Sequence, residues 1–261
     1  MRQFTDYEDH YEFCRKKFLN ENKFSTKDIR DLAFDGATLS FKKEYQDLVN
    51  KLAKRTQEKF STIKEIPTGT FSLNIENPFQ YTEVIGILDL VKRKIEREIS
   101  SCYLTTNRVE IIRSVHSDKT KSSSWLWHYD NNSEFHFKLF IYLSDVDDNS
   151  APFEYLHKGD SCAAVKTTRT YPGNIAESIF KHSRIPREDL KKLKDMGYNV
   201  RSATGPKGTW FLFDPNIIHR ATVPKKGNYR DALVYHLHPI SFSCREYKNL
   251  TDQKTTIYEM K

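Results

Sequence analysis

The chain has no apolar run long enough for a membrane-crossing helix. Such a helix needs roughly 18 or more consecutive apolar residues, and no stretch of the 261-residue sequence approaches that length. The N-terminal sequence MRQFTDYEDHYEFCRK has no apolar core either, so no secretory signal peptide is expected. Repeats with periods of roughly 20 to 50 residues and low-complexity tracts are also absent, which excludes a solenoid.

Cysteine is scarce and scattered along the chain. The four cysteines form no CxxC pair, and they stand at Cys14, Cys102, Cys162 and Cys244. A disulfide framework or a structural zinc site is therefore not expected, and the cysteine usage predicts a reducing, cytoplasmic location.

No single sign of charge dominates the sequence. The 42 basic and 35 acidic residues leave a net charge of +7, with lysines and acidic residues interleaved. Such an excess is compatible with an anionic ligand or nucleic acid. No basic cluster interleaved with aromatic residues marks a nucleic-acid groove, however. We expect a small-molecule substrate, no nucleic-acid or membrane partner, and a monomer or homodimer.

Aromatic residues are abundant, and they exclude a wholly disordered chain. They make up 13% of the sequence, with 17 Phe and 14 Tyr, although the chain is polar on average. A chain of this length buries roughly three quarters of its unfolded surface, which allows a sizeable core. Its length is compatible with one or two domains.

The apolar pattern is helical before about residue 105. Residues 40–60 and 82–99 both carry apolar side chains at helical spacing, with Lys and Glu between them. Thr82 is expected to be the N-cap of the second helix. Residues 186–197 predict one further helix, which opens at Pro186 and ends before Gly197.

After about residue 107 the pattern becomes that of strands. Segments dense in β-branched and aromatic residues alternate with turns, at residues 108–116, 136–143, 207–213 and 230–238. This predicts a mainly β fold, an antiparallel double-sheet jelly roll with flanking N-terminal helices. The simplest organisation is one domain, with a largely helical flank at 1–105, the jelly-roll core at 106–240 and a C-terminal extension at 241–261.

Candidate metal ligands lie at the ends of the predicted strands. His128 and Asp130 are two positions apart, so in an extended segment their side chains point to the same side. His219 follows an apolar strand and a proline-containing turn, in a position where loops often present ligands. Two histidines and one carboxylate leave open positions on a six-coordinate metal, which is typical of non-haem Fe(II) oxygenases.

Arg230 stands eleven residues after His219, at the start of the next predicted strand. On that strand it shares a face with Ala232, Val234 and His236. A buried guanidinium needs an acidic partner, either from the protein or from an anionic cosubstrate. Its planar fork suits a carboxylate bound through two hydrogen bonds.

Taken in order, these motifs resemble the phytanoyl-CoA dioxygenase family of Fe(II)- and 2-oxoglutarate-dependent oxygenases. The resemblance covers about residues 105 to 240 and rests on WHYD at 127–130, KLFIYLSDV at 138–146, APFEY at 151–155, and His219 with Arg230. It implies a cupin-like double-stranded β-helix in which His128, Asp130 and His219 bind Fe(II). It also implies that 2-oxoglutarate chelates the iron, that Arg230 pairs with its distal carboxylate, and that O2 is the oxidant.

The resemblance implies hydroxylation of an unactivated C–H bond, with release of succinate and CO2. The expected substrate is a small, anionic or amino-acid- or lipid-derived metabolite. Related halogenating enzymes lack the carboxylate ligand that Asp130 supplies here, so halogenation is not expected. Two alternatives stay open, a non-catalytic jelly-roll binding module and an oxygenase that acts on a macromolecule.

Two positions depart from the family pattern. Ala221 stands where members often carry a hydroxyl residue that helps to hold 2-oxoglutarate. A Gly-Ser-His element that often follows the Pro-Phe-Glu stretch is replaced by residues 156–160. Neither departure removes an expected iron ligand.

Other residues near these motifs are interpreted as structural. Lys138 is expected to keep its head in water at the surface rather than to contact a cosubstrate. Arg220 is equally compatible with a surface position and a contact to a substrate carboxylate. The strand histidines His136, His236 and His238 are expected to be structural residues whose polar atoms have partners. The tryptophans are expected to lie in the core: Trp125, Trp127 and Trp210.

Overall fold

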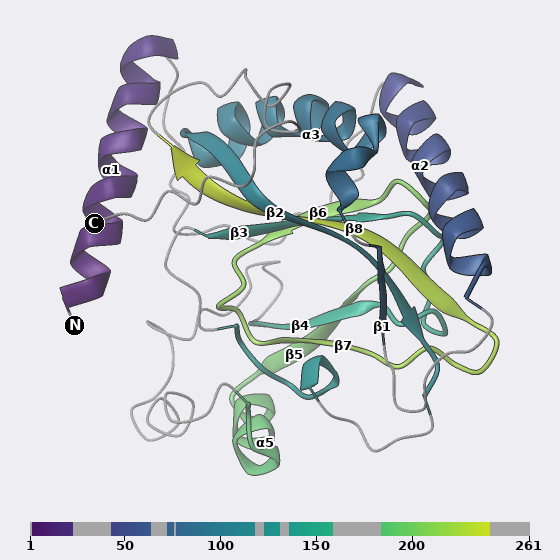
Figure 1. Cartoon of the computed structure of the whole chain (residues 1–261). Helices are drawn as coiled ribbons and strands as arrows, with labels where there is room; N and C mark the ends of the chain where they lie inside the picture. The colour runs from purple at the N-terminus through teal and green to yellow at the C-terminus, as the bar shows by residue number, and fades with distance from the viewer. Residues whose placement is uncertain are drawn as a thin grey trace.

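Two antiparallel sheets face each other, and helices cover the outer face of the larger one (Figure 1). The computed structural model describes residues 2–22, 43–63, 72–75, 77–117, 123–130, 136–158 and 184–240. The α-helices are α1 (Arg2–Asn22), α2 (Lys43–Ser61), α3 (Thr82–Lys94) and α5 (Arg187–Asp195). Short 3₁₀ turns occur at η2 (Pro78–Gln80) and η4 (Ser123–Trp125), and η3 (Ile95–Ser100) is a π-helix.

The larger sheet has the strand order β1-β2-β8-β3-β6 and the smaller sheet the order β5-β4-β7. All neighbouring strands are antiparallel. The larger sheet contains β1 (Ser72–Ile75), β2 (Tyr103–Val115), β3 (Phe137–Tyr142), β6 (Trp210–Phe213) and β8 (Tyr229–Ile240). The smaller sheet contains β4 (Phe153–Lys158), β5 (Tyr198–Ala203) and β7 (His219–Ala221).

The predicted start of the third helix is shifted by one residue. Tyr81, not Thr82, is the N-cap of α3, and it makes no side-chain capping bond. Thr82 has a helical conformation, so its hydroxyl does not cap the first turn as the N-cap prediction required. Beyond Lys94 the helical path continues as η3 and ends at Ser101, whose φ of 46° lies in the left-handed region.

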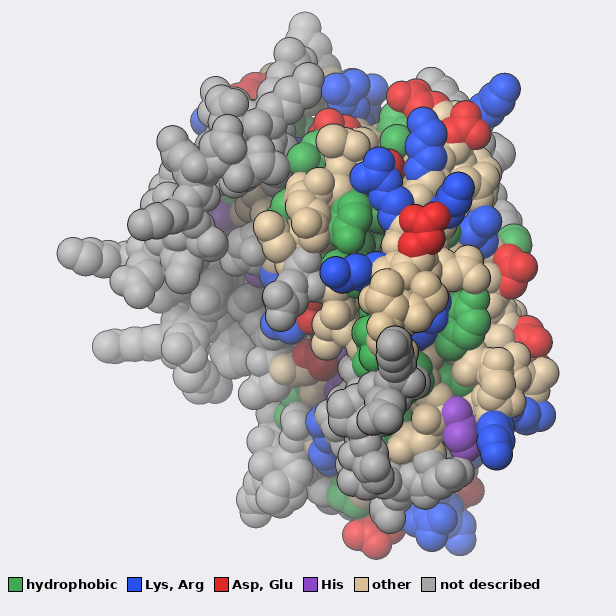
Figure 2. All heavy atoms as spheres, turned by 45° about the vertical axis from the view of Figure 1, so that its right-hand side comes forward, with side chains coloured by type: hydrophobic (Ala, Val, Ile, Leu, Met, Phe, Trp, Pro, Cys, Tyr) green, Lys and Arg blue, Asp and Glu red, His purple; other side chains and the backbone are tan. Residues whose placement is uncertain are grey.

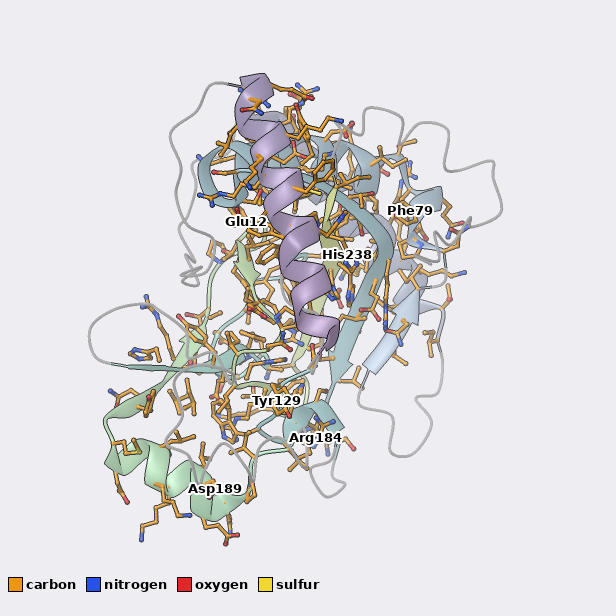
Figure 3. The ribbon with its side chains drawn as sticks, turned by 90° about the vertical axis from the view of Figure 1, so that its left-hand side faces the viewer. Glu12, Phe79, Tyr129, Arg184, Asp189 and His238 are labelled. Atoms are coloured by element: carbon orange, nitrogen blue, oxygen red, sulfur yellow. The ribbon has the colours of Figure 1, made fainter. Side chains whose placement is uncertain are left out.

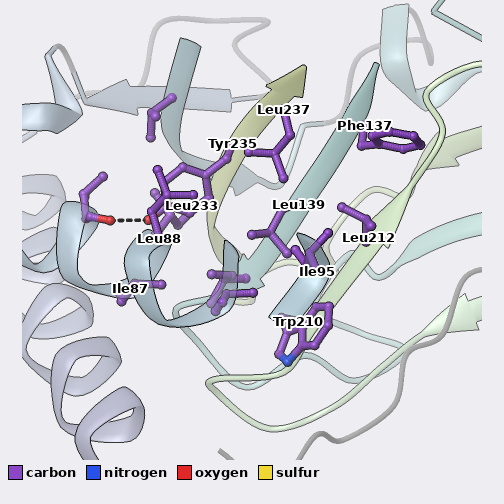
Figure 4. Packing of buried hydrophobic residues seen from close by; sticks show 14 of the residues in the cluster. Ile87, Leu88, Ile95, Phe137, Leu139, Trp210, Leu212, Leu233, Tyr235 and Leu237 are labelled. Atoms are coloured by element: carbon purple, nitrogen blue, oxygen red, sulfur yellow. Dashed lines mark hydrogen bonds between the residues drawn. The ribbon is translucent and has the colours of Figure 1, made fainter. Parts of the chain in front are cut away.

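Alternation along β8 decides what each face of the larger sheet contacts. Leu233, Tyr235 and Leu237 point outward and pack against α2 and α3 in one continuous core (Figure 4). The hydroxyl of Tyr235 donates a 2.6 Å hydrogen bond to the carbonyl of Val84 in α3, which satisfies a buried polar group. Each fully buried leucine contributes roughly 1.5–3 kcal/mol, so this face anchors the helices to the sheet.

The space between the two sheets is filled mainly by aromatic side chains. Phe140 and Phe211 stack with their ring centroids 5.2 Å apart, and Phe153 from the smaller sheet packs on both. Ala232 and Val234 complete this inner cluster from β8. The two-faced pattern predicted for residues 230–238 is therefore confirmed.

The mainly β fold with flanking helices is also confirmed. The division of the chain into flank, core and extension stays a prediction, and residues 241–261 lie outside the described residues. Among the described residues, no helix combines the length and apolar character needed to cross a bilayer. On the face shown in Figure 2, basic and acidic side chains lie interspersed, as the sequence predicted.

Candidate metal centre and cosubstrate site

The two predicted metal-binding segments lie side by side because backbone hydrogen bonds join them. His128 and His219 exchange both N–H···O bonds at 2.9 Å, which forms an isolated antiparallel bridge. The N–H of Asp130 donates to the carbonyl of Pro215 at 2.9 Å. These bonds hold 128–130 in register beside the start of β7, so side chains from two distant segments meet at one point.

Within the part of the chain that the structure describes, His128, Asp130 and His219 are the one group of three residues suited to hold a metal ion. One ligand atom from each lies within 4.8 Å of the others. The Oδ1 atom of Asp130 lies 3.4 Å from Nε2 of His128 and 3.9 Å from Nε2 of His219. The sequence prediction of this triad therefore agrees with the geometry.

Both histidines are held in the form that a metal needs. The Nδ1 atom of His128 lies 2.7 Å from the carbonyl oxygen of Leu126, and that of His219 lies 2.9 Å from the carbonyl oxygen of Ile217. A carbonyl can only accept, so each Nδ1 carries the proton and each Nε2 keeps a free lone pair. Such partners orient ligating histidines in metalloproteins.

Electrostatics keep the set ready for a cation at neutral pH. Burial lowers the pKa of His219 to about 3, aided by the neighbouring His128, so its imidazole is neutral. Burial opposes ionisation of Asp130, but the adjacent imidazoles of His128 and His219 and the ammonium group of Lys138 outweigh it and lower the pKa of Asp130. Neutral imidazoles with an ionised carboxylate are the protonation states that ligate metals.

Arg230 is a buried cation on the inward face of β8, and its side chain is not fully paired. It donates to the carbonyl of Ala151 at 2.7 Å and to the hydroxyl of Ser114 at 3.0 Å, while its Nε has no partner among the described residues. The adjacent Asp231 is engaged on the other face, through two 2.7 Å hydrogen bonds from Arg113. Among the described residues, no carboxylate forms an ion pair with Arg230, and the adjacent Asp231 acts on it only as a nearby charge.

The inward face of the larger sheet divides into two ends. We call Phe140, Tyr142, Phe211, Ala232 and Val234 the aromatic end, which lies toward Arg230 on β8. Beyond it lies what we call the polar end, which consists of residues of β2, β3 and β8 and of the residue just before β3: Arg108, Glu110, His136, Lys138 and His236. Figure 3 looks toward this side of the molecule, where His238 lies beside α1.

A hydrogen-bonded chain at the polar end links β2 and β8 to the residue just before β3. Arg108 donates to Glu110 at 2.8 Å, Nε2 of His236 lies 3.0 Å from the other Glu110 oxygen, and Nδ1 of His236 lies 3.2 Å from His136. The bond from His236 lowers the pKa of Glu110 to about 2, and burial lowers the pKa of His136 to about 3. The ring of His238 packs against that of His136 in a tilted arrangement, with centroids 4.3 Å apart. The sequence predicted structural histidines here, but not the hydrogen-bonded chain that joins His136 and His236 to Glu110.

Lys138 and Arg220 are both paired with carboxylates of the protein. The side chain of Lys138 is only 18% exposed and pairs with Asp130 at 2.5 Å, so the prediction of a surface lysine was wrong. Arg220 pairs with Glu154 at 2.6 Å and lies over the ring of Trp127, 4.6 Å from its centroid. Arg220 is therefore engaged by the protein itself. Trp125, Trp127 and Trp210 are buried as expected.

Comparison with a curated protein gives a short match. L-proline trans-4-hydroxylase from Streptomyces griseoviridis is 27% identical over 118 residues. The match covers 39% of the present chain and 43% of the hydroxylase, so the chain spans less than half the length of the curated relative it matches. No family model matches the sequence.

Solved structures match over most of the chain. EctD from S. alaskensis with bound iron superposes with a TM-score of 0.56 at 15% identity, covering 84% of this chain and 79% of EctD. The non-haem α-ketoglutarate-dependent epimerase SnoN from nogalamycin biosynthesis gives 0.53 at 10% identity, covering 88% and 83%. The chain therefore shares the fold of these solved structures. This confirms the fold that the family resemblance implied.

Proposed function

We propose that this protein is an Fe(II)- and 2-oxoglutarate-dependent oxygenase that hydroxylates a C–H bond of a small molecule. The observation that carries the proposal is the pairing of a complete His-Asp-His ligand set with a buried arginine that has no carboxylate partner among the described residues. The first fits a divalent metal with open positions. The second fits the distal carboxylate of an anionic cosubstrate.

The site residues would have separate roles in binding the metal and the cosubstrate. His128, Asp130 and His219 would hold the iron, and Arg230 would hold the distal carboxylate of 2-oxoglutarate. When bound, the iron and 2-oxoglutarate supply the activation of O2, with release of succinate and CO2 and transfer of one oxygen atom to the substrate. Phe153 and Phe213 flank His219, with ring centroids 5.2 and 5.4 Å away, and exclude water from that ligand. Ala221 adds no hydroxyl to the cosubstrate site.

The proposed substrate is a small molecule of anionic or amino-acid character. Similar proteins support this class, since one is named as a proline hydroxylase and EctD has been solved with 2-oxoglutarate and 5-hydroxyectoine. A lipid-derived acid stays within the proposal. A cytoplasmic location is also part of it, supported by the free thiols of Cys14 and Cys102.

Asp130 favours oxygenation over halogenation. With three protein ligands and a cosubstrate that chelates through two atoms, one of six positions is left for O2 and none for a halide. Incubation with substrate, 2-oxoglutarate and excess chloride under air is expected to give a product heavier by one oxygen atom. A chlorinated product from the unmodified protein would overturn this coordination argument.

The test of the proposal is succinate formation from 2-oxoglutarate in the presence of Fe(II) and a panel of amino acids and small carboxylic acids. Turnover is expected with at least one substrate, and the Asp130→Ala variant, checked for folding by circular dichroism, is expected to lose it. A protein that binds panel members without producing succinate would be the non-catalytic binding module. Turnover on peptides or nucleic acids alone would favour an oxygenase of macromolecules.

A further inference from the structure

Lys138 contacts the carboxylate of the candidate metal centre from inside the barrel. It lies on β3, where its register partners are Phe213 on β6 and His236 on β8. Its Nζ donates to Oδ2 of Asp130 at 2.5 Å, and the two side chains are only 18% and 20% exposed. The ammonium group of Lys138 therefore contacts one of the three expected metal ligands directly.

The two oxygens of Asp130 have different partners. Oδ1 faces the Nε2 atoms of His128 and His219, at 3.4 and 3.9 Å, whereas Oδ2 is bound by Lys138. A carboxylate with both oxygens free can bind a metal through one oxygen or chelate it through two. Here the second oxygen, Oδ2, is already held by the ammonium group of Lys138.

We propose that Lys138 is a positioning residue that keeps Asp130 a one-oxygen ligand and thereby preserves a coordination place for 2-oxoglutarate or O2. This inference rests on the proposed function. Three protein donors, two cosubstrate donors and O2 fill six places, so a chelating Asp130 would displace one of the reactants. Lys138 prevents this because its ammonium neutralises and hydrogen-bonds the oxygen that would otherwise move to the metal.

Other features of the polar end fit this role better than a general structural one. His236, the register partner of Lys138 on β8, already bonds Glu110 and His136. Among the described residues, Asp130 is the one carboxylate with which Lys138 forms an ion pair. A buried lysine is costly unless it is paired, so its presence inside the barrel is explained by Asp130.

The test compares Lys138→Met, which removes the charge but keeps the length, with Lys138→Arg, which keeps the charge. Lys92→Met is the matched control, because Lys92 is also buried and pairs with a carboxylate, Glu96 at 3.4 Å, on the helical layer. Each protein is loaded with Co(II), and its affinities for Co(II) and then for 2-oxoglutarate are measured. Crystal structures of the Co(II)-loaded proteins report how Asp130 binds.

In Lys138→Met, Asp130 is expected to bind Co(II) through both oxygens. Co(II) affinity should be unchanged or higher, while 2-oxoglutarate affinity falls by ~10-fold or more, the scale of effects from groups that orient metal ligands. Lys138→Arg and Lys92→Met should keep one-oxygen ligation and the wild-type 2-oxoglutarate affinity. A fall in 2-oxoglutarate affinity without a fall in Co(II) affinity distinguishes a positioning role of Lys138 from a general loss of structure.

The inference is overturned if Asp130 keeps one-oxygen ligation in Lys138→Met, or if both affinities fall together, as a structural role would predict. Failure of the unmodified protein to bind Co(II) or 2-oxoglutarate is a different result. It would overturn the proposed function itself, and the role of Lys138 with it.

Discussion

The polar end and the aromatic end of the inward sheet face differ in the partners of their positively charged side chains. At the polar end the cations have carboxylate partners, Arg108 with Glu110 and Lys138 with Asp130. At the aromatic end Arg230 has a carbonyl and a hydroxyl for partners and keeps one nitrogen unpaired. The charges of the polar end are paired within the protein, whereas Arg230 is the place where we propose that an anionic cosubstrate binds.

The largest expected effect on 2-oxoglutarate binding comes from removing the charge of Arg230. In Arg230→Met, 2-oxoglutarate affinity should fall by ~100-fold or more, since two charge-assisted hydrogen bonds of about 1.5–3 kcal/mol each are lost. The melting temperature without 2-oxoglutarate should stay level or rise, because a buried cation is replaced by an apolar side chain of similar length. Calorimetric titration and thermal unfolding check both outcomes.

Arg230→Lys keeps the charge and loses the planar fork, so its affinity should lie between those of wild type and Arg230→Met. Unchanged 2-oxoglutarate affinity in Arg230→Met would show that another residue binds the carboxylate. A large fall in stability would show that Arg230 belongs, like the polar end, to the structural charges.

A second, smaller effect concerns acid sensitivity of the polar end in the metal-free protein. The pKa of His136 is about 3 in the folded protein, lowered by burial and by the charges of His238, His236 and Lys138 and opposed by Asp130. In the unfolded chain it is about 6.5. Below pH 6.5 the unfolded state therefore binds a proton that the folded state does not, and stability falls as the pH drops toward 3.

From pH 7.5 to 5.5 this single group should lower the free energy of unfolding by about 1.4 kcal/mol. Urea unfolding of wild type and His136→Gln at both pH values isolates the contribution of His136 to the pH dependence of stability. The other histidines contribute equally to both proteins. The wild type should lose more stability than the variant. Equal losses would mean that His136 is charged or exposed when folded, which contradicts the described arrangement.

The smallest effect is expected at Arg220, which the protein itself already engages. In Glu154→Gln the ion pair with Arg220 is weakened, but both side chains are partly exposed, at 26% and 15%. The loss of stability should be about 1 kcal/mol or less, with unchanged 2-oxoglutarate affinity. A strong effect on substrate turnover with normal cosubstrate binding would instead place Arg220 in the substrate site.

The sequence was informative where local periodicity decides the outcome. Two-residue spacing placed His128 and Asp130 on one side of an extended segment, and alternation assigned Arg230 to the inward face of β8. The sequence was uninformative where contacts between distant segments decide which side chains meet. Lys138 meets Asp130 only because backbone hydrogen bonds place residues 128–130 beside Pro215 and His219. Glu110 meets His236 from 126 residues away only through the register of β2 with β8. The N-cap of α3 was also misplaced, because Thr82 is a strong capping residue by type and yet lies inside the helix.

The most direct test of the central claim is anaerobic addition of Fe(II) and then 2-oxoglutarate to the unmodified protein, followed by visible absorption. An Fe(II) chelate of a 2-oxo acid absorbs by metal-to-ligand charge transfer, so a new band that saturates at one equivalent of each is expected. It should be lost in Asp130→Ala and require far more 2-oxoglutarate in Arg230→Met. If no band forms with the unmodified protein, or if it persists in Asp130→Ala, the triad is not an iron site of this kind.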